Sequence, residues 1–420
     1  MSYYHQTPIM KRILEFIDES VYIKATDPNP DVDKRFRRYN DIIDAMGDGV
    51  DLHRSNLDFK RSILMIDLEY GNQNYPGEIF HNPLGSFQKL EPTRAAVKNM
   101  LDENNVSYIE TMTGQGYNFT MGVPRNSQTY ASLLKVGEQM RVLPESAAKR
   151  LQHKQSRYGN VPLIEDHIVS TAFGRINDYI FDSIRDTPGL IMRTTDLFDN
   201  PEIAIFDSTQ HAYLLSRRAF RTVFSLHQKS RMHPKYNYHG PAIVTLPVDG
   251  IPLEDRIQIR QDERNSYARA VDIARNSTGE IPNTDLTNLI TNYLFSNTAK
   301  KHLEFAEKLG FSDSEFTLPF LKANSMNWDI PPMPDWSLIG GLNIDPKLWD
   351  VFAHPNDEML KPTNIRHIIG ELSSKGVADT EIISLLAQKY NENHGWTVDV
   401  TKTDPILRAE YWVRTLKEQL

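Results

Sequence analysis

The stretch that most constrains the fold is an apolar run that leads into two acids. Residues 63–66 are Ile, Leu, Met and Ile, which is typical of a buried strand, and Asp67 and Glu69 follow with one residue between them. Since successive side chains of a strand point to opposite faces, both carboxylates should project from one face at the strand's end. Two like charges there repel unless a cation lies between them, and oxygen ligands on a rigid strand suit Mg²⁺ or Mn²⁺. The alternative is a solvated strand end, which is the commoner meaning of such a pair in isolation.

Bulk properties narrow the classes of protein further. The chain has 420 residues, which favours two or more domains, and its net charge of -8 argues against coating nucleic acid by bulk charge. It contains no cysteine, which excludes disulfides, iron–sulfur clusters and cysteine-ligated zinc. The N-terminal residues lack the apolar core of a signal peptide, and no apolar run is long enough to span a membrane. We therefore expect a cytoplasmic protein without a membrane partner.

The order of the predicted elements indicates an α+β fold. Strand patterns occur at 63–66, 106–124, 203–207 and 242–248. A helical pattern at 91–105 separates the first two, and beyond about residue 255 helical patterns prevail. All five tryptophans fall in the last quarter of the chain, which is a shift in composition. We expect a mixed domain over residues 1–283 and a separate helical C-terminal domain over 284–420.

A third acid and a basic stretch follow each other later in the chain. Asp207 ends the apolar strand at 203–206 and would complete a two-metal site with the first two acids. Residues 208–248 contain no Asp or Glu. Their cations are Arg217, Arg218, Arg221, Lys229, Arg231 and Lys235. The stretch is either a solvated basic loop or a cradle for a triphosphate and a nucleic-acid backbone. We favour the cradle, because basic groups beside a carboxylate–metal cluster are what nucleotidyl transfer needs.

A glycine-containing turn lies between the two short strands of 106–124. Its sequence, TMTGQGYNF at 111–119, leaves the backbone amides near the two glycines open to an approaching phosphate. The pattern alone is weak. The chain has no G-x-x-x-x-G-K-[ST] loop and no H-E-x-x-H motif, so neither of those sites is present.

In their order and spacing, these segments resemble the catalytic core of the archaeo-eukaryotic primase superfamily, the primase-polymerases. The family's first motif is a strand ending D-x-D or D-x-E, matched by Asp67 and Glu69, and its third is an apolar strand ending in Asp, matched by Asp207. The second motif, S-G-x-x-G-x-H, is matched by residues 113–118, with one residue fewer between the two glycines. A basic residue and an S-x-H-x-K segment follow the third acid, matched here by Arg221 and residues 225–229, and the resemblance covers about residues 60–250.

The resemblance implies a primase-polymerase-type α+β core and a metal-dependent nucleotidyltransferase. Such an enzyme acts as a primase or a template-dependent polymerase, which joins nucleoside triphosphates to a 3′-hydroxyl on a nucleic-acid template and releases pyrophosphate. The implied partners are nucleoside triphosphates and a single-stranded DNA template, and the resemblance also admits a helicase or another replication protein. The C-terminal helical domain loosely resembles the accessory domains of primases.

Carried over residue by residue, the resemblance implies three groups of site residues. Two Mg²⁺ or Mn²⁺ ions would be bound at a catalytic centre formed by Asp67, Glu69 and Asp207. The nucleotide would be bound by Thr113, Gly116, Asn118, Arg221, Ser225, His227 and Lys229. Nucleic acid would be bound by Arg217, Arg218, Arg231 and Lys235.

One position departs from the family, and two alternatives stay open. The family's second motif ends in His, where this chain has Asn118, which donates a neutral hydrogen bond but cannot become cationic. The first alternative is a metal-dependent nuclease, although the common E-x-K pattern is absent because Gly71 stands where the lysine would be. The second is a non-catalytic nucleic-acid-binding protein with a primase fold, for which Asn118 is the best argument.

Overall fold

The computed structural model divides into two compact units, each described here by itself. Unit 1 comprises residues 1–143, 151–193 and 200–300, and unit 2 comprises residues 144–150, 194–199 and 301–420. The residues that the structure describes are 3–26, 33–36, 42–43, 46, 50–72, 74–140, 152, 160–187, 191–193, 202–206, 219–232, 236–248, 250–261, 263–308, 342, 344–345, 362–391, 409 and 412–413.

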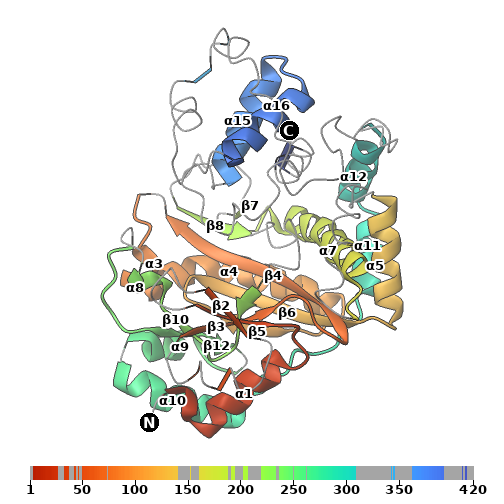
Figure 1. Cartoon of the computed structure of the whole chain (residues 1–420). Coiled ribbons are helices and arrows are strands. Elements are labelled where there is room, and N and C mark those ends of the chain that lie inside the picture. The colour runs from red at the N-terminus through yellow and green to blue at the C-terminus, as the bar shows by residue number, and fades with distance from the viewer. Residues whose placement is uncertain are drawn as a thin grey trace. The chain divides into compact units, whose positions relative to one another are not determined.

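A six-stranded mixed sheet lies at the centre of unit 1 (Figure 1). Its strands are β4 (Arg61–Asn72), β5 (Ile109–Met112), β6 (Gly116–Pro124), β7 (Ile191–Arg193), β8 (Glu202–Phe206) and β12 (Leu246–Pro247). They lie in the order β12-β5-β6-β4-β8-β7, and only β7 and β8 are parallel neighbours. The strands predicted around the glycine turn and at 203–206 are confirmed. The central strand, β4, is much longer than the 63–66 run that predicted it.

Two further sheets, one of four strands and one of two, complete unit 1 together with several helices. The remaining strands are β1 (Ile23–Thr26), β2 (Asp33–Phe36), β3 (Asp51–Ser55), β9 (Ala219–Arg221), β10 (Leu226–His227) and β11 (Ile243–Val244). The helices are η1 (Tyr3–His5), α1 (Thr7–Ile17), α3 (Glu78–His81), α4 (Pro83–Glu103), α5 (Gln128–Gln139), α7 (Leu163–Ile184), α8 (Lys229–Met232), α9 (Leu253–Gln261), α10 (Glu263–Asn276) and α11 (Thr287–Leu294). A further helix, α12 (Asn297–Lys308), begins in unit 1 and continues past its last residue, Lys300. The described chain is therefore a mixture of helix and sheet, as the sequence predicts.

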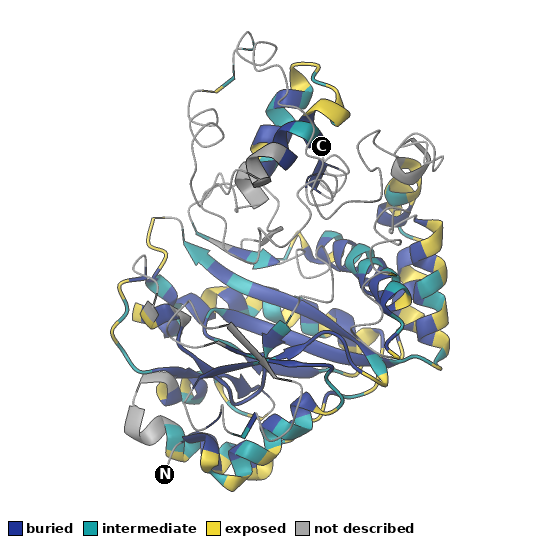
Figure 2. Cartoon of the chain, viewed as in Figure 1, coloured by how far each residue is buried: buried dark blue, intermediate teal, exposed yellow. Residues whose placement is uncertain are grey.

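The two faces of β4 pack into different cores, as the alternation of a strand's side chains requires. Leu64, Ile66 and Leu68 belong to a first core that α4, α5 and α7 cover. Ile63 and Met65 belong to a second core, which they share with α1, α10 and the four-stranded sheet β2-β1-β3-β9. Buried residues therefore run along β4, β5 and β6, the middle strands of the sheet (Figure 2). Asp67 and Glu69, which alternate with Leu68 along β4, must therefore lie on the face of the sheet that carries the second core.

The segment 242–248 links the second sheet region to the central sheet. The sequence predicts one strand here, whereas the structure divides it into two short strands around Thr245. The first, β11, pairs with β10, and the second, β12, pairs with β5. Thr245 N–H donates to Ser225 O over 2.9 Å, and Phe224 N–H donates to Thr245 O over 2.7 Å. Through this segment the S-x-H-x-K stretch is attached to the glycine-turn strands.

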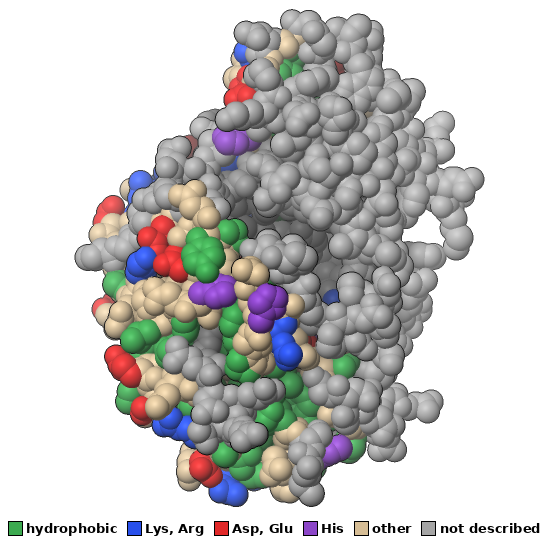
Figure 3. Space-filling view, turned by 90° about the vertical axis from the view of Figure 1, so that its left-hand side faces the viewer, with side chains coloured by type: hydrophobic (Ala, Val, Ile, Leu, Met, Phe, Trp, Pro, Cys, Tyr) green, Lys and Arg blue, Asp and Glu red, His purple; other side chains and the backbone are tan. Residues whose placement is uncertain are grey.

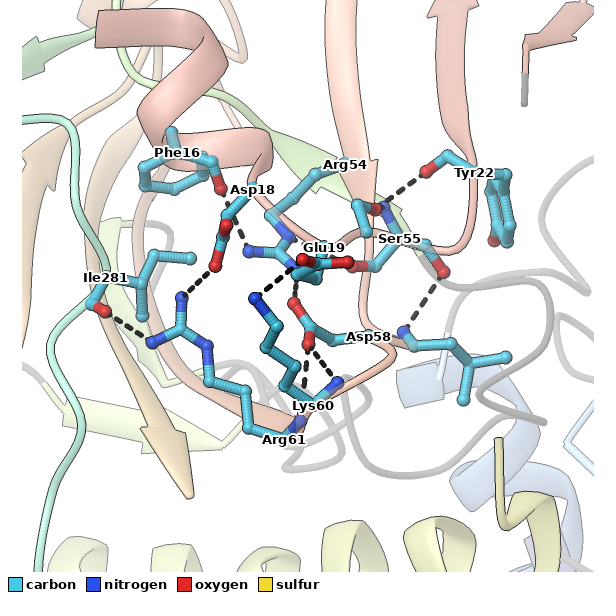
Figure 4. A network of polar contacts seen from close by, with 12 residues as sticks. Phe16, Asp18, Glu19, Tyr22, Arg54, Ser55, Asp58, Lys60, Arg61 and Ile281 are labelled. Carbon is cyan, nitrogen blue, oxygen red and sulfur yellow. Dashed lines mark hydrogen bonds and ion pairs between the residues drawn. The ribbon is translucent and has the colours of Figure 1, made fainter. Parts of the chain in front are cut away.

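A buried ion pair fixes the turn between β3 and β4 (Figure 4). Arg54 Nη2 donates to Asp58 Oδ2 over 2.8 Å, and both side chains are fully buried. Arg54 also donates to Phe16 O over 2.9 Å, while Asp58 Oδ1 accepts from the backbone N–H groups of Lys60 and Arg61. Burial lowers the pKa of Arg54, and the adjacent Asp58 opposes that shift. The network sets where β4 begins and thereby which of its residues face each core.

The described part of unit 2 is mostly helical, and the C-terminal segment of this unit begins at residue 301 rather than at 284. Its helices α15 (Pro362–Ser374) and α16 (Asp379–Asn391) bury apolar residues such as Ile369 and Leu386. The predicted boundary is 283/284, but the contacts keep residues up to Lys300 in unit 1. The reason is that α11 packs its apolar stripe into the first core. No helix within the described ranges has both the length and the hydropathy to cross a membrane.

Candidate functional site

The two acids of β4 lie inside a continuous strand. The sequence predicts that they stand at the strand's end, but β4 continues through both to Asn72, so that prediction is wrong. Asp67 is opposite Asn118 of β6, and Glu69 is opposite Gly116. Asp67 is only 8% exposed and Glu69 is half-buried. Because they alternate with Leu68, which faces the first core, both carboxylates project from the other face, as predicted.

Asn118 makes the best-defined polar contact to these acids. With its amide nitrogen turned toward the carboxylate, it donates to Asp67 Oδ1 over 2.7 Å and to Tyr117 O over 3.1 Å. Asn118 is 6% exposed, and its neighbour on β5, in the same cross-strand row, is Thr111. Tyr117 points to the opposite face and lies in the first core. Asn118 is thus placed to hold the Asp67 carboxylate in one orientation.

The glycine turn is built by internal hydrogen bonds and by close backbone approach to β4. Thr113 Oγ1 accepts from Gly116 N–H over 3.1 Å, so this hydroxyl closes the turn. A Cβ on Gly116 would lie 1.8 Å from Leu68 O, which leaves no room for a side chain there. Gln115 O accepts from Tyr70 N–H over 2.9 Å. The turn is therefore fastened to the strand segment that carries the acids.

His227 lies directly against this turn. A Cβ on Gly114 would come within 2.4 Å of His227 Nδ1 and 2.5 Å of its Cε1, so only glycine allows the imidazole to lie there. His227 itself is buried, and it follows the turn by more than a hundred residues in the sequence. The middle residue of the S-x-H-x-K segment and the glycine turn therefore form one structural unit.

The other residues of the S-x-H-x-K region serve mainly as anchors in the described contacts. Ser225 Oγ accepts from Leu52 N–H over 2.7 Å and is fully buried. Arg221 Nη1 pairs with Asp51 Oδ2 over 2.7 Å and also donates to Leu226 O. Both side chains were predicted to hold a triphosphate, yet these contacts turn them toward β3 and the segment itself.

The predicted cations have mixed outcomes. If residues 225–229 were an extended segment, His227 and Lys229 would share a face and bind the nucleotide together, as expected from the sequence. Instead Lys229 begins the short helix α8, so that reason for grouping the two side chains is wrong. Arg231 is exposed on the same helix. The structure does not describe the positions of Asp207, Arg217, Arg218 and Lys235, nor the side chain of Lys229. Within the described ranges, no group of three or more His, Asp or Glu side chains forms a metal site.

The sequence did not reveal two residues that position this region. Asp51 of β3 accepts from Gln228 N–H over 3.1 Å as well as pairing with Arg221. Tyr4 OH accepts from Leu226 N–H over 2.8 Å. Both act across long sequence separations, so no local pattern could have pointed to them. They show that the acid-free stretch 208–248 receives its balancing acid from another part of the chain.

A second polar cluster lies on the opposite face of the same strands. Arg94 Nη2 donates to Glu110 Oε2 over 3.0 Å, and Arg256 Nη1 donates to Tyr117 OH over 3.2 Å. Tyr117 OH also donates to Glu91, which pairs with Arg94 over 2.7 Å. Burial raises the pKa of Glu110, and the bound Arg94 opposes that rise. We call Glu91, Arg94, Glu110, Tyr117 and Arg256 the balanced cluster, because its two acids face two arginines.

The chain is similar to a solved structure, but it matches no family model and no curated sequence. Among solved structures, the polymerase domain from Mycobacterium tuberculosis Ligase D in complex with DNA is similar, with a TM-score of 0.37 and 12% sequence identity. The match covers 69% of this chain and 91% of that chain. A likeness at this level carries no argument about function, and the functional assignment rests on the contacts of this chain's own residues.

Proposed function

We propose that the chain is a metal-dependent nucleotidyltransferase that joins nucleoside triphosphates to a 3′-hydroxyl on a nucleic-acid template, as a primase or a template-dependent polymerase. The observation that carries the proposal is a convergence of three segments. The acids of β4 are paired with the strand that leaves the glycine turn, and His227 lies against that turn. These are three of the four segments of the primase-like pattern, and the last of them follows the others by more than a hundred residues.

The third acid of the proposal, Asp207, directly follows β8 in the sequence, and β8 pairs with β4. Phe206, the last residue of β8, is opposite Leu68, and Ile205 is opposite Glu69. We propose that the carboxylates of Asp67, Glu69 and Asp207 hold two Mg²⁺ or Mn²⁺ ions. The donors fit such ions, since all three side chains offer only hard oxygen ligands.

The proposed mechanism assigns separate work to each segment. When bound, the metal ions would supply the positive charge that activates the 3′-hydroxyl and stabilises the departing pyrophosphate. Asn118 keeps the Asp67 carboxylate in the orientation in which it can act as a ligand, as partners of metal ligands commonly do. His227 and the amides of the glycine turn lie together where phosphate oxygens could be bound by hydrogen bonds. Lys229 and Arg231 are the proposed cations for the triphosphate and template backbone.

Primer extension with matched carboxylate variants tests the proposal. Asp67→Asn and Glu69→Gln remove one negative charge each with little change of shape, and incorporation should fall by about a hundredfold or more. Asp102→Asn is the control, because Asp102 is an exposed acid of α4 that pairs with Lys98. Extension that persists in both site variants at the wild-type rate would contradict the proposal.

The observation at Asn118 favours one second candidate, a non-catalytic nucleic-acid-binding protein. The amide hydrogen bond to Asp67 satisfies part of a buried carboxylate without any metal. The same experiment separates the two functions. A non-catalytic binder would bind primed template but show no Mg²⁺- or Mn²⁺-dependent incorporation in the wild type.

A further inference from the structure

A series of aromatic rings runs from the glycine turn to the protein surface. His227, beside that turn, stacks with Phe80 at 6.1 Å between ring centroids. Phe80 contacts the Tyr238 ring at 5.5 Å, and Tyr238 meets His81 edge-on at 6.0 Å. His81 then stacks with Tyr75 at 5.5 Å and an interplanar angle of 15°. We call these five residues the aromatic ladder.

The outer end of the ladder is open to solvent. Tyr75 is 46% exposed, and His81 is also exposed. Among the described residues, His81 is the only ring that stacks on Tyr75. Figure 3 shows the side of the molecule on which α3 and α8 lie, where histidine side chains gather beside hydrophobic ones. A large flat ring is therefore presented to solvent with a second ring behind it.

The backbone around Tyr75 is held in place. Its N–H donates to Asn72 Oδ1 over 3.0 Å, and its carbonyl accepts from Glu78 N–H over 2.9 Å. His81 Nε2 lies 3.1 Å from Tyr236 O. A Cβ on Gly77 would lie 2.3 Å from the same carbonyl, so the two segments approach as closely as backbone allows. An aromatic ring held in this way loses little conformational freedom when a ligand stacks on it.

We propose that Tyr75, supported by His81, stacks on an unpaired base of single-stranded DNA that leads toward the site. The inference rests on the proposed function for the identity of the strand, and it adds the surface by which the strand is held. Every base offers a π-face, so stacking on an exposed tyrosine holds a template regardless of its sequence. The ladder places this ring at the outer end of a series of packed rings whose inner end is His227, beside the glycine turn.

The test compares strands with and without bases. Fluorescence anisotropy at one fixed salt concentration gives Kd for a labelled oligo(dT) and for an abasic strand of equal length. Tyr75→Ala should weaken oligo(dT) binding by about tenfold and leave abasic binding unchanged, while Tyr75→Phe should resemble the wild type. Phe59→Ala is the matched control, since Phe59 is 51% exposed in the same unit and lies outside the ladder. Thermal melting confirms that the variants are folded.

Several results would overturn the inference. The first is that Tyr75→Ala binds oligo(dT) as tightly as the wild type, and the second is that it loses affinity equally for both strands. The third is that Tyr75→Phe or Phe59→Ala loses as much affinity for oligo(dT) as Tyr75→Ala does. A wild type without preference for oligo(dT) over the abasic strand would also overturn it. Failure of the proposed function would give a different result. The wild type would then show no metal-dependent incorporation, while Tyr75→Ala would still lose affinity for oligo(dT) and not for the abasic strand.

Discussion

The two faces of the β4–β6 pair both carry buried polar groups, yet they are constructed differently. On the first-core face, the balanced cluster sets Glu91 and Glu110 against Arg94 and Arg256. On the second-core face, Asp67 accepts from the neutral amide of Asn118, and Glu69 is opposite a glycine. The strands are the same, and the register fixes which residues reach each face.

The difference separates a structural role from a chemical one. A charge-balanced buried network stabilises the fold only while all its members are present, and removing one leaves a buried charge uncompensated. Carboxylates flanked by an amide and a glycine present oxygen ligands to whatever cation binds there. We therefore expect changes on the first face to act on stability and changes on the second face to act on metal binding and incorporation.

The largest effect should follow from breaking the balanced cluster. Glu110→Ala removes the bidentate partner of Arg94, and it should lower the free energy of unfolding by about 3 kcal/mol. Urea denaturation measures the loss. The exposed pair Lys98–Asp102 supplies the control, because Lys98→Ala should cost less than about 1 kcal/mol. Equal losses in the two variants would show that the cluster is no more than a surface pair.

The pH dependence of stability gives the next effect on the same side of the sheet. Burial in α7 lowers the pKa of His167 from 6.5 to about 4. Above pH 6.5 the histidine is neutral in both states and its contribution to stability is complete. As the pH falls from 6.5 to 4, the unfolded chain takes up the proton first, so stability should fall by about 3 kcal/mol or less.

The variant His167→Leu isolates that contribution. Its unfolding free energy should vary less between pH 6.5 and 4 than that of the wild type, since the buried group can no longer titrate. Urea denaturation at a series of pH values gives the comparison. Parallel pH profiles for the two proteins would show that His167 is not buried in its neutral form.

A smaller effect should follow from adding charge to the second face. Asn118→Asp places a carboxylate directly opposite Asp67, where like charges destabilise a strand pair by about 1 kcal/mol. In EDTA its Tm should fall below the wild-type value by several degrees, and Mg²⁺ should restore more of it than it adds to the wild type. Asn118→Leu, which adds no charge, is the control. An identical Mg²⁺ response in all three proteins would contradict the role of this face.

The sequence predicted the central sheet well because its signals there are local. The apolar run, the alternation of the two acids with Leu68 and the glycine turn each depend on neighbouring residues. Helix ends were harder. The sequence places Pro92 near the first turn of a helix, whereas α4 begins at Pro83, where Asn82 accepts from Gly85 N–H, and Pro92 lies inside it. The earlier proline and its capping asparagine were the better start signal.

The site was less predictable, since its partners are distant in the sequence. The roles expected for Arg221 and Ser225 overlooked β3, whose Asp51 and Leu52 bind them. Contacts between residues that are this far apart in the sequence produce no periodic pattern from which they could be predicted. The end of the segment was also misjudged, because a helix beginning at Lys229 changes which side chains share a face. Asn118, the departure from the family pattern, has a local partner that the strand register explains once β4 and β6 are aligned.

A direct titration with Mn²⁺, followed by electron paramagnetic resonance, tests the central claim that Asp67, Glu69 and Asp207 hold catalytic metal ions. The account predicts saturable binding in the wild type and at least about tenfold weaker binding in both Asp67→Asn and Asp207→Asn. Asp102→Asn should bind as the wild type does. Mn²⁺ binding that is unchanged by both substitutions would contradict the account, because the carboxylates would then not be the ligands.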